Sequence, residues 1–216
     1  VTKSQRLHLG LTPTPYVGCL DQASVFVLLL NPGFGPLNYH AEFQAPGARC
    51  VQLDCIAQNE ANHRRGFYSL SPEASWRGGF RYWHGKLAKV SAELARQRDM
   101  SLVDAFALVR RKLAVIELVP YHSAAFKLPR GVLGQLRSVR LAQEYVQQIV
   151  LPKADRGDAT VVVTRKAKFW GLEPSERVVV YGAGESRGAH LGPATRGGQA
   201  ILRALLKTAE TDCGTA

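Results

Sequence analysis

An apolar strand that ends abruptly in a rigid turn is the feature that most constrains the fold of this chain. Residues 24–30 read Ser-Val-Phe-Val-Leu-Leu-Leu, and Asn31-Pro32-Gly33 follows directly. Such a run is typical of a strand buried on both faces, as in a parallel sheet. The turn places Asn31 at the carboxyl end of the strand, where open α/β sheets bind ligands. A simple chain reversal without chemistry is an equally good interpretation of the turn alone.

Further strands and helices alternate along the rest of the chain. Apolar segments predict strands at residues 114–119, 159–164 and 177–181. Helical patterns cover residues 87–98, 101–112, 136–150 and 198–209, the second with Ser101 as N-cap and Asp104 three residues later. This alternation predicts an α/β fold, a three-layer α/β/α sandwich around a central, mainly parallel sheet of about four strands. We expect one domain over residues 1–216, with the irregular stretch 34–75 around the mouth of a site.

The charge of the chain favours a polyanionic partner. Its 216 residues include 28 Lys and Arg against 17 Asp and Glu, a formal net charge of +11. Basic clusters occur at residues 63–65, 110–112 and 165–168. Nucleic acid is the first partner that such a balance suggests, and a merely basic surface is the simpler alternative.

The cysteines and the apolar segments exclude several other classes of protein. Cys19, Cys50, Cys55 and Cys213 form no C-x-x-C pair, which argues against a zinc site or a disulfide framework. No apolar run approaches the ~18 residues that cross a bilayer, and no signal peptide pattern opens the chain. We therefore expect reduced thiols, a cytoplasmic monomer, no membrane association, and neither a metal nor another cofactor.

Polar, turn-like segments follow three of the predicted strands, at residues 31–33, 120–123 and 182–195. The carboxyl ends of parallel strands meet at one edge of a sheet, so Asn31, Tyr121 and His190 should lie near a common site. Neighbouring arginines favour the neutral form of the His190 imidazole, which can still donate a hydrogen bond. An exposed loop histidine is the alternative.

Two familiar motifs in the last segment do not fit their usual contexts. Gly184-Glu-Ser186-Arg-Gly188 matches a nucleophile elbow, but the acid and the distant histidine that should follow it are missing. Residues 182–184 suggest a dinucleotide loop, yet only one helix remains after them and no further strand. We expect neither chemistry.

Together these segments resemble the uracil-DNA glycosylase superfamily, and most closely its mismatch-specific and thymine-DNA branch. The segment from Glu117 to Ser123 is also similar to that of uncharacterised bacterial members of the superfamily. The first motif of that branch is also an apolar strand ending in N-P-G. The resemblance implies that Asn31 positions the attacking water and that Phe43, about a dozen residues later, stacks on the extruded base. The second motif, often H-P-S-P, reads His190-Leu191-Gly192-Pro193 here and lacks the serine. Glu117-Leu-Val-Pro120 stands where one branch has N-x-x-P, so a glutamate replaces the amide.

The resemblance implies a DNA-binding glycosylase, acting on DNA rather than RNA, that hydrolyses the N-glycosidic bond of an altered or deaminated base. Asn31 and His190 are the expected catalytic residues, with His190 as donor to the departing base. Phe34 or Phe43 would serve as the aromatic platform. The other expected base-binding residues are Gly33, Glu117, Tyr121 and His122. Expected contacts to the nucleic-acid backbone come from Arg187, Thr195 and Arg196.

Two alternatives accompany this prediction. One is a catalytically silent protein of the same fold that binds a nucleic acid or a nucleotide. The other is an enzyme of free nucleotides or nucleosides, for which the positive charge would be excessive. Glu117 favours these alternatives, because a carboxylate only accepts hydrogen bonds whereas an amide also donates them.

Overall fold

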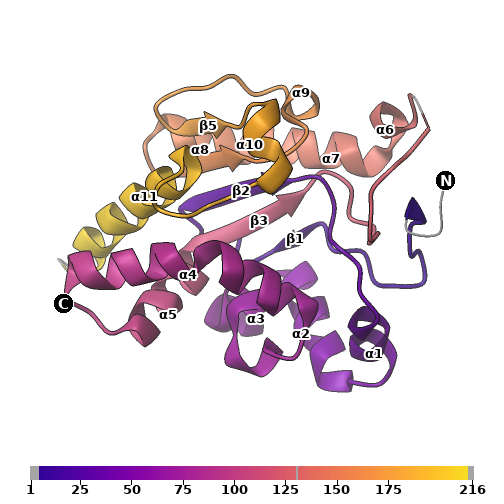
Figure 1. Cartoon of the computed structure of the whole chain (residues 1–216), viewed down its shortest axis with the longest axis horizontal. Helices are drawn as coiled ribbons and strands as arrows, with labels where there is room; N and C mark the ends of the chain where they lie inside the picture. Colours follow the sequence, from indigo (N-terminus) through magenta and orange to yellow (C-terminus); the bar gives the residue numbers. More distant parts are fainter. Residues whose placement is uncertain (1–4, 130, 214–216) are drawn as a thin grey trace.

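The computed structural model of the chain describes residues 5–129 and 131–213. Within them, one sheet has the strand order β1-β3-β2-β4-β5 (Figure 1). Its strands are β1 (Tyr16–Val17), β2 (Val25–Leu29), β3 (Leu113–Glu117), β4 (Thr160–Val163) and β5 (Val178–Val180). The four predicted strands are therefore confirmed, and β2 to β5 run parallel. The added strand β1 pairs antiparallel with β3 at the edge of the sheet. Two residues are too few to produce a readable alternation.

Helices cover both faces of the sheet, so the predicted three-layer sandwich is confirmed. One layer contains α4 (Gly78–Arg98), α5 (Leu102–Lys112) and α11 (Arg196–Cys213). The other contains α6 (Val132–Gln135), α7 (Arg137–Tyr145), the π-helical turn η4 (Val146–Val150), α8 (Leu151–Asp155) and α9 (Ala167–Trp170). In Figure 1, α7 to α9 lie above the sheet, and α4 and α5 lie below it.

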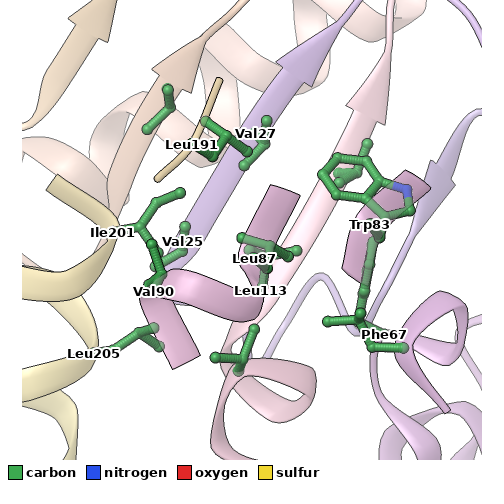
Figure 2. Packing of buried hydrophobic residues seen from close by; sticks show 14 of the residues in the cluster. Val25, Val27, Phe67, Trp83, Leu87, Val90, Leu113, Leu191, Ile201 and Leu205 are labelled. Carbon is green, nitrogen blue, oxygen red and sulfur yellow. The ribbon is translucent and has the colours of Figure 1, made fainter. Parts of the chain in front are cut away.

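The central strands are apolar on both faces because each face contributes to a different core. Val25, Val27 and Leu29 of β2 pack towards α4, whereas Phe26 and Leu28 pack towards α7. Figure 2 shows the first of these cores, with side chains from β2, β3, α4 and α11, including Val25, Val27, Leu87, Val90, Leu113, Ile201 and Leu205. The uninterrupted apolar run in β2 thus follows from burial on two sides.

The predicted helices also appear, and one of them changes its type along its length. The hydroxyl of Ser101 accepts a hydrogen bond from the backbone N–H of Asp104 at 3.1 Å, which is the expected N-cap of α5. The predicted helix 136–150 instead begins as α7 and passes through η4 into α8. Pro152 has no backbone N–H to continue the α-helical ladder, and the turn before it is π-helical.

Residues 34–75 are more regular than their sequence pattern suggests. They form α1 (Leu37–Phe43), α2 (Pro46–Ala57), α3 (Glu60–Arg65) and the 3₁₀ turns η2 (Tyr68–Leu70) and η3 (Pro72–Ala74). These helices are held by polar tertiary contacts rather than by a long apolar stripe. Gln52 of α2, for example, is buried and donates to the Thr12 carbonyl and to the Thr14 hydroxyl, both at 3.0 Å.

Among the helices in the described part of the chain, none combines the length and the apolarity that crossing a membrane requires.

Candidate functional site

A cavity of about 570 Å³ lies at the carboxyl ends of β2 and β3, against the first turns of α4. Five residues predicted for the site line it, namely Asn31, Gly33, Phe34, Glu117 and His122. Aromatic side chains form much of the remaining wall, including Tyr68, Phe80, Tyr82, Trp83 and Phe126. The volume falls within the ~300–1,000 Å³ typical of small-molecule pockets.

The alternation of side chains along the strands explains why Asn31 and Glu117 reach the same cavity. Val115 faces the α4 layer, so Glu117, two residues further along β3, faces it as well. In the neighbouring strand Leu29 also faces this layer, and it pairs in register with Glu117. Asn31 lies two residues beyond Leu29. The parallel register of β2 and β3 therefore brings the amide and the carboxyl to one edge.

Asn31 connects the two loops that form the floor of the cavity. Its Nδ2 donates to the backbone carbonyls of Pro32 at 3.0 Å and Tyr121 at 3.1 Å, and to the Ser123 hydroxyl at 2.9 Å. Carbonyl oxygens only accept hydrogen bonds, so the amide orientation is determined by chemistry. Oδ1 has no hydrogen-bond partner among the described residues. The amide thus keeps an acceptor available beside the cavity.

His122 lines the cavity, and hydrogen bonds hold its ring in one neutral tautomer. Its Nδ1 lies 2.8 Å from the Gly33 carbonyl and must donate, because that oxygen only accepts. Nε2 lies 3.1 Å from the Thr14 hydroxyl and can accept from it. Burial lowers the pKa of His122 below its ordinary value, although the bond to Gly33 opposes this. Both ring nitrogens are occupied, so His122 positions the turn after β2 and has no free ring nitrogen for a base.

Glu117 is the most unusual polar residue of the cavity. Its side chain is buried, with 6% of the residue surface exposed, and Oε2 has no hydrogen-bond partner in the described part of the chain. Burial raises the pKa of Glu117 to about 8, against the opposing positive charge of Arg165. At neutral pH the carboxyl is therefore mostly protonated, and it offers an O–H donor beside a carbonyl acceptor. The expectation of a carboxylate that only accepts hydrogen bonds is revised by this environment.

Two other residues predicted for base binding do not line the cavity. The Tyr121 side chain packs against the core of the α7 layer, and only its backbone carbonyl contributes, by accepting from Asn31. Phe43 lies on α1 with 59% of its surface exposed and stacks on Tyr39, with ring centroids 6.1 Å apart.

The loop after β5 holds the other predicted residues, and they too lie outside the cavity lining. The Thr195 hydroxyl donates to the Gly192 carbonyl at 2.8 Å and accepts from the Gly198 N–H at 3.1 Å. Arg196 forms an ion pair with Glu185 at 2.6 Å. These groups therefore find their partners within the loop and at the start of α11.

His190 and Arg187 belong to the same loop region and have exposed side chains. The carbonyl of His190 accepts a hydrogen bond from the hydroxyl of Tyr181. Arg187 follows Ser186 in α10 (Ala183–Gly188), and its carbonyl accepts from Arg165 at 3.4 Å. The Ser186 hydroxyl donates to the Gly182 carbonyl at 2.9 Å, which is a local helical contact.

Arg165 and the start of α4 are parts of the cavity that the sequence reasoning missed. Arg165 lines the cavity and comes directly after the predicted strand 159–164, so the same strand-end rule could have found it. Arg77 and Tyr82 have no such signal. The neighbouring Trp83 packs its helix against the core, whereas Tyr82 is 42% exposed at the cavity.

The described residues hold no group of His, Cys, Asp or Glu that could bind a metal ion. Cys19, Cys50 and Cys55 are free thiols, and the Cys213 side chain lies outside the described residues. Comparison of the chain with models of protein families, with curated proteins and with solved structures found no match.

Proposed function

We propose that this protein hydrolyses the N-glycosidic bond of an altered or deaminated base in DNA, with the base held in the cavity beside Asn31 and Glu117. One observation carries the proposal. The cavity combines a fixed amide acceptor with a buried, protonated and unpartnered carboxyl, and aromatic rings surround both. A glycosylase needs these three elements, because it must hold a water, read a base edge and stack the extruded base.

Asn31 is suited to hold the attacking water. In the proposed reaction the water oxygen forms a bond to C1′ of the sugar, and the C1′–N bond breaks with its electron pair leaving on the base. The proton released by the water ends on the base or in solvent. Oδ1 of Asn31 can accept a hydrogen bond from this water. The three donor contacts of Nδ2 hold the amide in place before the substrate arrives, which lowers the cost of reaching the transition state.

Glu117 and Arg165 are suited to bind the base. A neutral carboxyl donates through its O–H and accepts through its carbonyl, so it can pair with adjacent acceptor and donor atoms on a base edge. Arg165 lines the same cavity, and its charge acts on the Glu117 carboxyl. A fixed cation there stabilises the negative charge that develops on the departing base.

Phe34 is the better supported of the two aromatic platforms. Its ring lines the cavity and stacks on His8, with centroids 3.5 Å apart and an angle of 9° between the planes. Extruding a nucleotide costs a few kcal/mol of stacking. Stacking on Phe34 offsets part of this cost, and attraction of the phosphates to a chain of charge +11 offsets more. The proposal includes a cytoplasmic, monomeric protein with DNA as its partner.

The direct test is base release from oligonucleotides that contain uracil, hypoxanthine, xanthine or mismatched thymine, followed by alkaline cleavage of abasic sites. We expect strand cleavage with at least one substrate and none with Asn31→Ala. Ser186→Ala is the matched control, because its hydroxyl makes only a local contact outside the cavity. Binding of every substrate without any base release would overturn the hydrolytic proposal and leave the silent binder.

A further inference from the structure

Four aromatic rings form a continuous row that begins at the cavity. Phe34 stacks on His8, and the Tyr39 ring meets both edge-on, with centroids 5.7 Å from His8 and 5.6 Å from Phe34. Tyr39 in turn stacks with Phe43 at 6.1 Å, with 15° between the planes. We call His8, Phe34, Tyr39 and Phe43 the aromatic row.

The aromatic row leads from the cavity into solvent. Phe34 lines the cavity, whereas Tyr39 is 40% and Phe43 59% exposed. Tyr39 and Phe43 are four residues apart on α1 and therefore lie on the same side of the helix. The Tyr39 hydroxyl lies 3.0 Å from Nδ1 of His8, which helps to hold the rings in place. The row is thus assembled within the protein itself, and its outer rings remain partly exposed to solvent.

We propose that the aromatic row binds the bases of a single DNA strand that continues from the nucleotide held in the cavity. This inference rests on the proposed function for the nucleotide in the cavity. Stacking on exposed rings is how proteins bind single strands without regard to sequence, because every base has a π-face. A paired duplex hides those faces and could not use the row.

The charge near the row fits this partner. Arg6 precedes His8 by two residues and is exposed. Arg77 lies over the ring of Trp76, and the Trp76 ring in turn meets the His40 ring of α1 edge-on. Cations beside exposed rings are typical of surfaces that follow a single-stranded backbone. The net charge of +11 supplies the longer-range attraction to phosphates.

The test compares a labelled 12-nucleotide thymidine strand with its duplex at low salt, using fluorescence anisotropy. We expect the single strand to bind at least about tenfold more tightly than the duplex, because only the single strand can stack on the row. Tyr39→Leu and Phe43→Leu keep an apolar side chain but remove the ring. Each should weaken single-strand binding by about tenfold and leave duplex binding within about twofold. Leu141→Ala, at an exposed apolar residue of α7, is the control and should change neither.

The outcomes separate this inference from the proposed function. Equal affinity for the two forms, or equal losses in both, would overturn the role of the aromatic row. If the variants lose only single-strand binding, the row stands even when no base is released. If base release occurs and depends on Asn31, but Tyr39→Leu and Phe43→Leu leave KM for single-stranded substrates unchanged, hydrolysis stands and the row is refuted.

Discussion

The turn after β2 and the loop after β5 both follow parallel strands at the same edge of the sheet, and both carry polar residues. At the first region, together with the adjoining end of β3, Oδ1 of Asn31 and Oε2 of Glu117 have no hydrogen-bond partner among the described residues, and both side chains line a cavity. In the second region, Thr195 and Arg196 are paired within the loop. A strand-end position is therefore insufficient for a binding site, because the local fold must also leave polar groups available.

The two regions also differ in what their polar groups cost the folded state. A buried polar atom without a partner destabilises a protein unless a ligand or a proton compensates. Glu117 reduces this cost by staying protonated, as its raised pKa indicates. The ion pair between Arg196 and Glu185 is largely exposed, so solvent screens it and it contributes little in either direction. The free-energy cost of burying Glu117 makes this residue a better indication of function than the exposed ion pair.

Among the predicted changes, Asn31→Ala should have the largest effect on base release. It removes the acceptor that we propose for the attacking water, which would act mainly in the transition state, so base release should fall by at least about 10³-fold. Affinity for an oligonucleotide should stay within a few-fold. Single-turnover rates and binding titrations measure the two effects separately, and a thermal melt reports the loss of the contacts to the loop after β3. A rate within about tenfold of the wild type would show that the turn after β2 takes no part in the reaction.

The pH dependence of activity should show the second largest effect. The proposed base contact needs the protonated carboxyl of Glu117, whose pKa is about 8. Activity should therefore fall about tenfold for each pH unit above that value. Glu117→Gln keeps a donor and an acceptor without titrating, so its rate should stay level over the same range. An identical decline in both proteins would assign the titration to another group.

The stability of the fold should depend on pH through the same residue. The folded-state pKa of about 8 exceeds the ordinary value of 4.5, so the folded protein binds more protons between these values. The contribution of Glu117 to the stability of the fold is therefore fully present below pH 4.5, and it is lost as the pH rises through 8. Since one pKa unit is about 1.4 kcal/mol, the full effect between the two pKa values is about 5 kcal/mol. Urea unfolding of the wild type and Glu117→Gln at pH 6 and 9 measures the roughly 3 kcal/mol of this effect that falls between those two pH values. An equal change of the unfolding free energy with pH in both proteins would contradict the burial of a titrating carboxyl.

His190→Ala should have the smallest effect and sharpens the contrast between the two regions. A donor to the departing base would slow base release by ~10²–10³-fold when removed. The exposed imidazole lies outside the cavity lining, so we expect a change below about tenfold. The measurement is again the single-turnover rate. A loss of 10²-fold or more would return His190 to the catalytic residues and show that the loop after β5 moves when substrate binds.

The sequence pattern was sufficient for the parts of the fold that depend on neighbouring residues. The apolar runs predicted four parallel strands, and Ser101 with Asp104 predicted the start of α5. The short strand β1 was not predictable, because its two residues depend on pairing with β3, about a hundred positions further along the chain. The three helices in residues 34–75 were missed for a similar reason, since contacts such as Gln52 with Thr14 hold them.

The residues of the candidate site show the same difference between local and long-range information. The sequence by itself placed Asn31, Gly33, Phe34 and His122 in the segments that follow two strands, because strand ends are readable from local composition. Glu117 lies inside a predicted strand, and only the family resemblance pointed to it. Only the tertiary structure decided that Tyr121 faces the other layer while its neighbour His122 lies under the cavity. It also decided that Glu117 is buried, which raises the pKa of its carboxyl. Burial and pairing depend on segments that are distant in the chain, and no local pattern records how those segments pack.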